Sequence, residues 1–561
     1  MDKLYGKKKS IMIFCVMMSV LVVNLFYWGN KKEGFFGDEL YSYHFVNQTD
    51  YPYITEDRGD ETWMNSWHTS DYFLDYLTTD GEEAFDISAT YLSIRKDVHP
   101  PLYYLLLKMF CSAFSLILPS VFSKWCGILL NISFFILTIP ILFKLAEYLT
   151  KSSIFAIITC ILYGFGIGAV STVVFLRMYM MFTFFSVLFT YINALLWKRL
   201  WEEKSDSKTA VYAALCLATI MGFLSHYYFV VYAFFISVFI WVCSIIVKRY
   251  RFAIKYALTM AIGILGSFLI WPDMRNDIFT GYRGEEALEN FAESTDWSSF
   301  KELLSIANAE LFGGCGGLLL IFFALALIYI VISVWWNLEK HITQEGNIRI
   351  LCERKEKRKK AELQISYADI VIIQILLAVV CYIYLISKIA PYREDRYIFN
   401  TFPMIMLMTV YTVQKLLSAL SADRTSRIIV LFAMLAVMAI GYISPGVNYL
   451  YKGTKQNLNT ANLYSDLPVF YISSGSTFRT CGDSVYLSKA PAVYPTRADS
   501  IGSLSDALEQ LVGRETSRCL VYIDLEIPDL NTVAAQVKQE LGVNEVRYLF
   551  DTEYSAAYIA E

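Results

Sequence analysis

The chain has 561 residues, of which 56% are hydrophobic and 18% are charged, and its net charge is -4. This composition is typical of an integral membrane protein, because globular domains are less apolar. The slightly acidic balance argues against a nucleic-acid-binding protein, since those proteins present a concentrated basic surface.

The first apolar run, 10–29, is about as long as a membrane-spanning helix and follows several lysines. These lysines predict that its start faces the cytoplasm. The stretch WGNKKEGFF that follows (28–36) has no small-residue cleavage site. We therefore interpret the run as a retained helix and not as a cleaved signal peptide.

A polar loop, 37–101, opens with GDELYSYHF and closes with DVHPPLYYLLL, which continues to residue 107. It contains three of the five histidines, His44, His68 and His99, together with acids and aromatic residues. Its Trp63, Trp67 and His68 could stack on a sugar ring. A structural role at the membrane interface is the favoured interpretation, because aromatic residues are common there.

Ten further apolar runs alternate with polar connections, at 121–146, 153–172, 179–197, 209–224, 229–247, 256–272, 312–336, 368–387, 397–414 and 428–444. Basic residues fall in every second connection, which the positive-inside rule assigns to the cytoplasm. If 102–118 also crossed the membrane, these basic connections would lie on the opposite side from the basic N-terminus. We therefore predict an interfacial helix at 100–118 on the outer face, starting at a double proline, and about eleven spanning helices in all.

We expect residues 1–444 to form a helical transmembrane module with a large first extracytoplasmic loop over 30–120. Residues 445–561 should form a small extracytoplasmic α/β domain, because VFYIS, CLVYIDL and VRYLF alternate there with helical patterns. A lid or acceptor platform is the favoured role for this domain. Its Cys481 and Cys519 could form a disulfide or remain free thiols, and no cysteine spacing resembles a zinc site.

Two places in the first loop suggest acid–base chemistry. Asp38 and Glu39 follow the first apolar run, where a carboxylate can accept a proton from a hydroxyl or simply cap a helix; on spacing alone the cap is favoured. His99 precedes Pro100 and Pro101, which stiffen the backbone, and Asp97 could orient its imidazole.

Cations and phenols also occur at predicted outer helix ends. They are Arg177 with Tyr179, His226 with Tyr227 and Tyr228, and Arg393 and Arg396 with Tyr397. Each one alone is explained as an interfacial anchor, but their shared side favours a site for an anionic lipid headgroup. Lys108, inside an apolar segment, could reach the surface or neutralise a phosphate, and both interpretations stay open.

With these motifs the chain resembles the GT-C membrane glycosyltransferases, in particular the glycosyltransferase family 39-like branch of protein O-mannosyltransferases and lipid A aminoarabinose transferases. The resemblance rests on GDE (37–39), DVHPPLYYLLL (97–107), LRMYMMF (176–182), SHYYFVVY (225–232) and DRYIFNTFPMI (395–405). It covers about the first four hundred residues in order, and the HPPLYY string with an upstream acidic pair is its most specific part.

The resemblance implies an inverting transfer of a sugar from a polyprenyl phosphate to an acceptor hydroxyl of a glycan, lipid or protein, on the extracytoplasmic face of the plasma membrane. Asp38 would be the general base and Glu39 would support it. The donor phosphate or sugar would be bound by His99, Tyr103, Lys108, Arg177, Tyr179, His226, Tyr227, Arg393, Arg396 and Tyr397. The turn LRMYM lacks the acid that follows arginine in some related transferases, which makes a bound divalent metal doubtful.

Two other functions are compatible with a polytopic chain. A transporter or flippase of lipid-linked glycans would commonly show charges near the membrane midplane and matching halves, and the sequence has few of the former and none of the latter. A non-catalytic scaffold for glycan assembly would tolerate replacement of both Asp38 and His99.

Overall fold

A computed structural model describes residues 2–47, 63–79, 81, 83–95, 97–201, 209–293, 297–318, 320–321, 324, 328, 336–342, 348–354, 366–419, 430, 446–475, 477–512 and 518–561. The chain divides into two compact units. The first comprises Met1–Asn24, Phe134–Thr172 and Tyr179–Val447. The second comprises Leu25–Ser133, Val173–Met178 and Asn448–Glu561, so it joins the first loop to the C-terminal tail.

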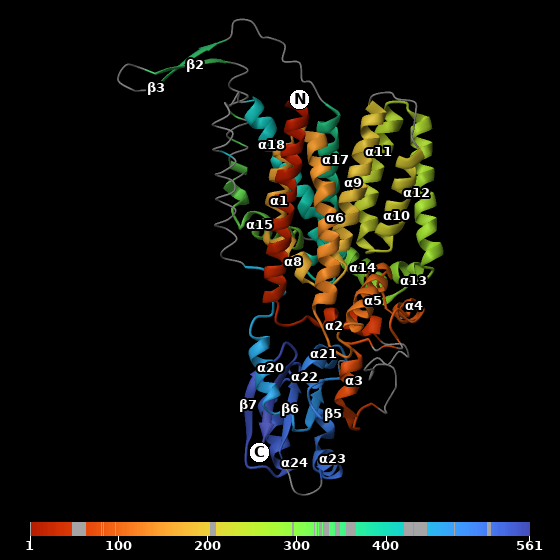
Figure 1. The fold of residues 1–561 in the computed structure, drawn as a ribbon, viewed down its shortest axis with the longest axis vertical. Helices are drawn as coiled ribbons and strands as arrows, with labels where there is room; N and C mark the ends of the chain where they lie inside the picture. Colours follow the sequence, from red (N-terminus) through yellow and green to blue (C-terminus); the bar gives the residue numbers. More distant parts are fainter. Residues whose placement is uncertain are drawn as a thin grey trace. The chain divides into compact units, whose positions relative to one another are not determined.

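The first unit is built mainly of helices (Figure 1). Its long elements, some of which continue into the second unit, are α1 (Asp2–Lys31), α6 (Trp125–Thr150), α7 (Ser153–Gly164), α8 (Ile167–Val174), α9 (Tyr179–Trp201), α10 (Thr209–Phe223), α11 (Tyr228–Ile246), α12 (Tyr250–Ile270), α17 (Tyr367–Ile389) and α18 (Phe402–Ala419). Shorter elements are α13 (Met274–Phe279), α14 (Tyr282–Glu293), α15 (Ser298–Phe312), two 3-10 turns, η1 (Asp395–Tyr397) and η2 (Phe399–Thr401), and an antiparallel hairpin, β2 (Trp336–Ile342) with β3 (Ile348–Arg354).

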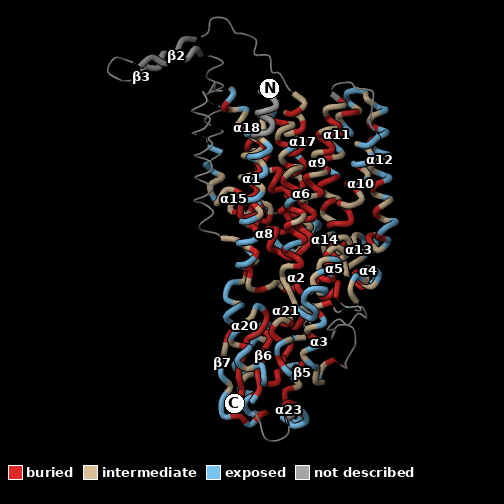
Figure 2. Tube along the Cα trace, in the orientation of Figure 1, coloured by how far each residue is buried: buried red, intermediate tan, exposed pale blue. Residues whose placement is uncertain are grey.

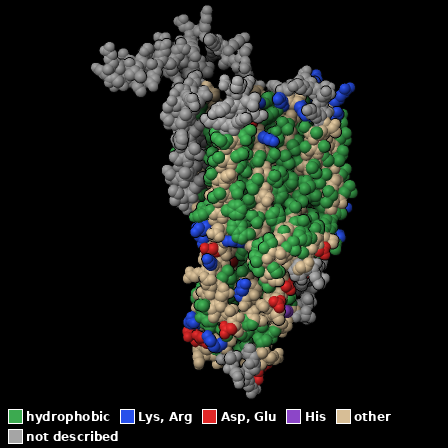
Figure 3. Space-filling model, in the orientation of Figure 1, with side chains coloured by type: hydrophobic (Ala, Val, Ile, Leu, Met, Phe, Trp, Pro, Cys, Tyr) green, Lys and Arg blue, Asp and Glu red, His purple; other side chains and the backbone are tan. Residues whose placement is uncertain are grey.

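Among the described residues, six helices are long and apolar enough to cross a membrane. They are Ser10–Lys31, Trp125–Thr150, Tyr179–Leu200, Tyr228–Ile246, Tyr250–Ile270 and Tyr367–Ile389, and α7 with α8, bent by 56°, would add a seventh. Hydrophobic side chains cover these helices on the face drawn in Figure 3. The chain is therefore a multi-pass membrane protein, as predicted. The predicted crossings at 312–336 and 428–444, and the basic run 353–360, fall largely outside the described residues.

Buried polar side chains tie the helices of the first unit together. The indole N–H of Trp197 donates to Gln374 (2.6 Å), whose amide donates to the carbonyl of Ile236 (2.6 Å). The phenol of Tyr256 donates to Asn193 (2.8 Å). These bonds connect α9 with α11, α12 and α17, and hydrogen bonds of this kind help to fix the packing where apolar surfaces alone are unspecific.

The second unit contains the helices of the first loop, α2 (Gly37–Asn47), α3 (Ser70–Asp75), α4 (Ile87–Ile94) and α5 (Leu102–Ser115). Helix α5 occupies the segment predicted to be interfacial, and Pro101 is its N-cap. It has 14 residues, which is shorter than a crossing needs. In the tail lie α20 (Thr454–Asn462), α21 (Thr477–Gly482), α22 (Ser484–Leu487), η3 (Ala498–Ser503), α23 (Leu504–Val512) and α24 (Leu530–Leu541).

A six-stranded sheet forms the centre of the tail, in the order β1-β5-β4-β6-β8-β7. Its strands are β1 (His68–Thr69), β4 (Val469–Ser473), β5 (Ala492–Arg497), β6 (Cys519–Asp524), β7 (Val546–Asp551) and β8 (Ser555–Ala560). Strands β5, β4 and β6 are parallel, whereas β8, β7 and β1 run antiparallel to their neighbours. The structure thus confirms the small C-terminal α/β domain. Sequence reasoning found β4, β6 and β7 but missed β5, β8 and the edge strand from the first loop.

The first loop is anchored to both faces of this sheet. Trp63 belongs to the apolar core on one face, and Trp67 packs on the other, where its indole donates to the carbonyl of Ala507 (3.0 Å). The strands between these cores are mostly buried (Figure 2). The two tryptophans are packing residues in this structure, but they pack on the sheet of the tail and not at the membrane interface expected from the sequence. Cys481 and Cys519 are both free and buried, in the two different cores.

We predict that Asp483 makes the stability of the second unit depend on pH. It is fully buried, accepts hydrogen bonds from Ser555 (2.7 Å) and Tyr471 (3.2 Å), and burial raises its pKa from 3.8 to about 6. Because the folded protein holds this proton more tightly than the unfolded chain, the free energy of unfolding should fall by about 2 kcal/mol as pH rises from about 4 to about 6.

The measurement is the melting temperature between pH 4 and 7 for the wild type and for Asp483→Asn, which cannot ionise. The wild type should lose stability relative to this variant as pH rises. Asp551→Asn, at an exposed position of the same unit, is the control and should follow the wild type. Parallel curves for all three proteins would show that Asp483 does not titrate in this range.

Candidate active site

The acidic pair predicted to act in catalysis lies in the first turn of α2. Carboxylates are favourable there because the amides and the dipole of a helix start attract negative charge. Glu39 accepts the backbone N–H of Phe36 through one oxygen (2.7 Å) and that of Leu176 through the other (2.7 Å). Glu39 thus caps its own helix, one of the two roles considered from the sequence, and links α2 to the segment 173–178.

A buried ion pair fixes Glu39 further. The ammonium of Lys32 lies 3.0 Å from each carboxylate oxygen of Glu39, and both side chains are 0% exposed. Lys32 also donates to the carbonyl of Tyr449 (2.8 Å). Burial raises the pKa of Glu39 and lowers that of Lys32, while the ion pair opposes both shifts. Both oxygens of Glu39 are therefore occupied by structural contacts, whereas neighbouring Asp38 is only half-buried.

The guanidinium of Arg177 forms the centre of the site. The segment that carries it is held by Asn131, whose amide donates to the carbonyls of Val173 (3.1 Å) and Phe175 (2.8 Å). Arg177 is 3% exposed. Its donors reach the carbonyl of Asp38 (3.0 Å), the hydroxyl of Ser42 (2.8 Å), the phenol of Tyr104 (3.1 Å) and Nε2 of His99 (3.1 Å).

These contacts close a ring of hydrogen bonds that determines the state of His99. A guanidinium can only donate, so Nε2 of His99 accepts from Arg177. Nδ1 then carries the proton and donates to Asp97 (2.8 Å), which also accepts from the phenol of Tyr104 (3.4 Å). Burial opposes the charge of Asp97, but His99 and Arg177 hold its pKa below the usual value. Asp97 orients His99, as predicted, and the imidazole side chain stays 30% exposed.

Two further predicted residues of α5 differ in their surroundings. The phenol of Tyr103 is fully buried and has no hydrogen-bond partner among the described residues. Burial raises its pKa, and the nearby charges of Arg177 and Glu39 act on it in opposite directions. Lys108, one turn after Tyr104, is buried and donates to the hydroxyl of Thr79 (3.4 Å). Tyr103 thus faces the charged network, whereas the hydrogen bond of Lys108 to Thr79 leads toward the α3–α4 connection.

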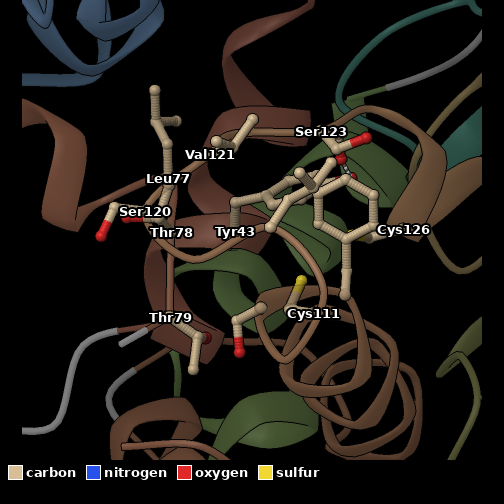
Figure 4. Close-up of a pocket in the computed structure, with 12 residues that line it drawn as sticks. Tyr43, Leu77, Thr78, Thr79, Cys111, Ser120, Val121, Ser123 and Cys126 are labelled. Carbon is tan, nitrogen blue, oxygen red and sulfur yellow. Dashed lines mark hydrogen bonds between the residues drawn. The ribbon is translucent and has the colours of Figure 1, made fainter. Parts of the chain in front are cut away.

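A pocket of about 230 Å³ lies beside these residues, between α2, α5 and the start of α6. Figure 4 shows the ring of Tyr43 next to the thiols of Cys111 and Cys126, with hydroxyls of threonine and serine around the opening. No charged side chain lines it. This pocket is therefore not the centre of the proposed chemistry.

The remaining predicted residues lie in the first unit, and three of them form an aromatic cluster. The ring of Tyr179 lies 5.2 Å from that of His226 and 6.4 Å from that of Tyr397. The imidazole of His226 also stacks on Phe182 (5.1 Å), and its Nδ1 accepts the backbone N–H of Tyr228 (3.0 Å).

Three residues near this cluster have acidic partners. Arg396 contacts Glu394 (2.9 Å) and lies over the ring of Tyr397 (5.3 Å). The phenol of Tyr227 donates to Asp277. Arg393 is more than half exposed and contacts Glu302 (3.6 Å). The structure therefore brings together Asp38, His99, Tyr103 and Arg177 in the second unit, and Tyr179, His226, Arg396 and Tyr397 in the first.

Sequence reasoning missed several residues of the network. From the sequence alone, Lys32 belongs to the flank of a membrane helix, Ser42 is an ordinary helical residue and Tyr104 is part of an apolar run. The one available signal was the string HPPLYY, in which Tyr104 lies one turn after the proline pair that follows His99. Within the described ranges, no group of three or more His, Cys, Asp or Glu side chains is arranged to hold a metal ion.

No protein-family model matches the chain, and no curated protein matches it by sequence. Among solved structures, the chain is similar to ArnT from Cupriavidus metallidurans, in crystal structures bound to undecaprenyl phosphate and in the apo state. Each comparison covers 98% of both chains at 10% sequence identity, with TM-scores of 0.49 and 0.48. At these values the likeness does not assign an activity to this chain.

We predict that the Lys32–Glu39 ion pair is a strong structural coupling. Glu39→Gln would leave the Lys32 ammonium buried without its counter-charge, and Lys32→Met would do the same to Glu39. Each change should lower the free energy of unfolding by about 3 to 5 kcal/mol. The double variant should lose clearly less than the sum of the two, which a double-mutant cycle of detergent-solubilised protein measures.

Lys31→Met is the matched control, because Lys31 is exposed and adjacent in sequence, and it should have little effect on stability. Additive losses in the cycle would mean that the two charges do not depend on each other.

Proposed function

We propose that this chain transfers a sugar from a polyprenyl phosphate donor to an acceptor hydroxyl, on the extracytoplasmic side of the membrane and with inversion at the anomeric carbon. The observation that carries the proposal is the cluster in which the half-buried Asp38 lies on the turn held by the buried guanidinium of Arg177. A proton acceptor and a fixed cation close to each other are what this reaction requires.

The cationic part of the cluster suits a phosphate leaving group. The planar guanidinium of Arg177 offers several parallel donors, and negative charge develops on the phosphate as the glycosidic bond breaks. His99 accepts from Arg177 through Nε2 and donates to Asp97 through Nδ1, so it holds the guanidinium in place, and we assign it to the donor site in this role. The buried phenol of Tyr103 is a further donor beside this network.

Among the three carboxylates of the cluster, we assign the general base to Asp38, which is half-buried and whose backbone carbonyl is held by Arg177. Glu39 is fully enclosed by Lys32 and two amides, and Asp97 is bound by His99. In the proposed step the acceptor hydroxyl gives its proton to Asp38 while its oxygen bonds to the anomeric carbon. The bond from that carbon to the phosphate oxygen breaks, and the lipid phosphate leaves with the electron pair.

The aromatic cluster of the first unit has the chemistry of a donor-binding element. Sugar rings pack on aromatic faces, and Tyr179, His226 and Tyr397 form a buried aromatic cluster in which Arg396 lies over the ring of Tyr397. We assign these residues to binding of the donor. Glu39, in contrast, is proposed to support Asp38 by holding the turn and not by taking part in proton transfer.

We predict that Asp38→Asn abolishes transfer, because an amide cannot accept the acceptor's proton. The loss should be about 10²-fold or more. It is measured as sugar released from a panel of polyprenyl phosphate hexoses and aminopentoses by purified protein, and by mass spectrometry of surface glycans and lipids in cells that carry the wild-type or variant chain.

Asp71→Asn is the control, since Asp71 is an exposed acid of the same loop, and it should behave as the wild type. Full activity of Asp38→Asn would refute the assignment of the base. Movement of a lipid-linked sugar across liposomes without any new glycosidic product would indicate a transporter instead.

A further inference from the structure

We propose that Tyr554, seven residues before the end of the chain, is a positioning residue for Asp38, and that through it the C-terminal domain holds the turn that carries the proposed base. This inference rests on the proposed function, which it extends. Its structural part, the contact between Tyr554 and the start of α2, can be tested without any assay of sugar transfer.

Tyr554 satisfies a donor at the start of α2. The first amides of a helix have no partner within the helix, and an unsatisfied buried N–H is costly. The N–H of Gly37, the first residue of α2, donates to the phenol oxygen of Tyr554 (2.5 Å), and this bond is buried. The carboxylate of Asp38 is one of the charges that act on this phenol, whose pKa is raised chiefly by burial.

The hydroxyl of Tyr554 completes a clamp on three consecutive residues. Gly37 is bound by Tyr554, the carbonyl of Asp38 accepts from Arg177, and Glu39 is held by its ion pair with Lys32. Asp38, the middle residue of the three, is half-buried. The clamp draws on segments from both ends of the second unit's sequence, so the direction of the Asp38 side chain depends on how the tail packs.

Tyr554 itself has little freedom. The guanidinium of Arg479 donates to the carbonyl of Tyr554 (2.8 Å) and lies 5.5 Å from the centre of the Tyr554 ring. Arg479 also forms an ion pair with Asp524. At Gly482 a Cβ atom would lie 2.2 Å from the ring, so only glycine leaves room for the tyrosine. The ring is thus held on two sides while its hydroxyl reaches α2.

The place of these contacts in the sheet is also informative. Asp524 ends strand β6, and Arg479 lies in the helix that follows the neighbouring parallel strand β4. Open α/β sheets commonly bind ligands at this carboxyl edge, beside the point where the strand order reverses. Here helix α21 at that edge packs against α2. The edge of the tail's sheet that faces α2 is therefore the carboxyl edge, where open α/β sheets commonly bind ligands.

The first test is amide hydrogen exchange of the full-length protein in detergent or nanodiscs. Tyr554→Phe removes the hydroxyl and keeps the ring, so peptides covering residues 36–42 should exchange about 10-fold faster or more. Tyr548→Phe is the control, because Tyr548 is 51% exposed in the adjoining hairpin, and it should leave these peptides unchanged. Unchanged exchange in Tyr554→Phe would overturn the proposal.

The second test asks whether the contact matters for the reaction. Tyr554→Phe should lower kcat about 10-fold, since small displacements of a reacting group have large effects on rate, and should leave the KM for the lipid donor within about twofold. A variant that only lowers the melting temperature, with kcat intact, would show that Tyr554 is structural and does not position the base.

A backup variant and a parallel assay keep the outcomes distinct. If Tyr554→Phe does not fold, Arg479→Lys loosens the same ring from its other side and should show the same accelerated exchange and lowered kcat; normal values for both would overturn the proposal. Asp38→Asn is assayed beside them. Full activity of Asp38→Asn refutes the proposed base, whereas an inactive Asp38→Asn with a fully active Tyr554→Phe refutes only the positioning role.

Discussion

The arrangement of the second unit depends on a charge that cannot be removed. A guanidinium keeps its proton under all ordinary conditions, so burying Arg177 obliges the protein to surround it with acceptors. Those acceptors come from α2, from the turn before α5 and from α5 itself. Satisfying one arginine therefore assembles residues that are distant in the sequence, and the same bonds fix the tautomer of His99 and the carbonyl of Asp38.

The two buried cations have different consequences for chemistry. Lys32 is matched by Glu39, both side chains are closed to solvent, and the pair fixes the geometry of the turn. Arg177 donates to His99, which in turn donates to Asp97. A ligand that binds on the exposed side of His99 can therefore interact with a cation whose orientation is already fixed, which is the preorganisation that stabilises developing charge.

Local patterns predicted part of this structure. Apolar runs gave the spanning helices, β-branched runs gave strands of the tail, and the spacing of Asp97 and His99 predicted their hydrogen bond. Long-range pairing was not predictable. Nothing in the sequence indicates that Lys32 finds Glu39, that the first loop adds a strand to the sheet of the tail, or that Tyr554 reaches Gly37. These contacts follow from tertiary packing, and the first of them is the reason why we propose that Glu39 supports Asp38 by holding the turn.

The most direct test of the central claim is an experimental structure of the protein with a polyprenyl phosphate. The account predicts that the phosphate lies within hydrogen-bond distance of Arg177 or His99, with the carboxylate of Asp38 on the side from which an acceptor would approach. A phosphate bound away from this network, or separated from Asp38 by more than the size of one sugar, would contradict the account.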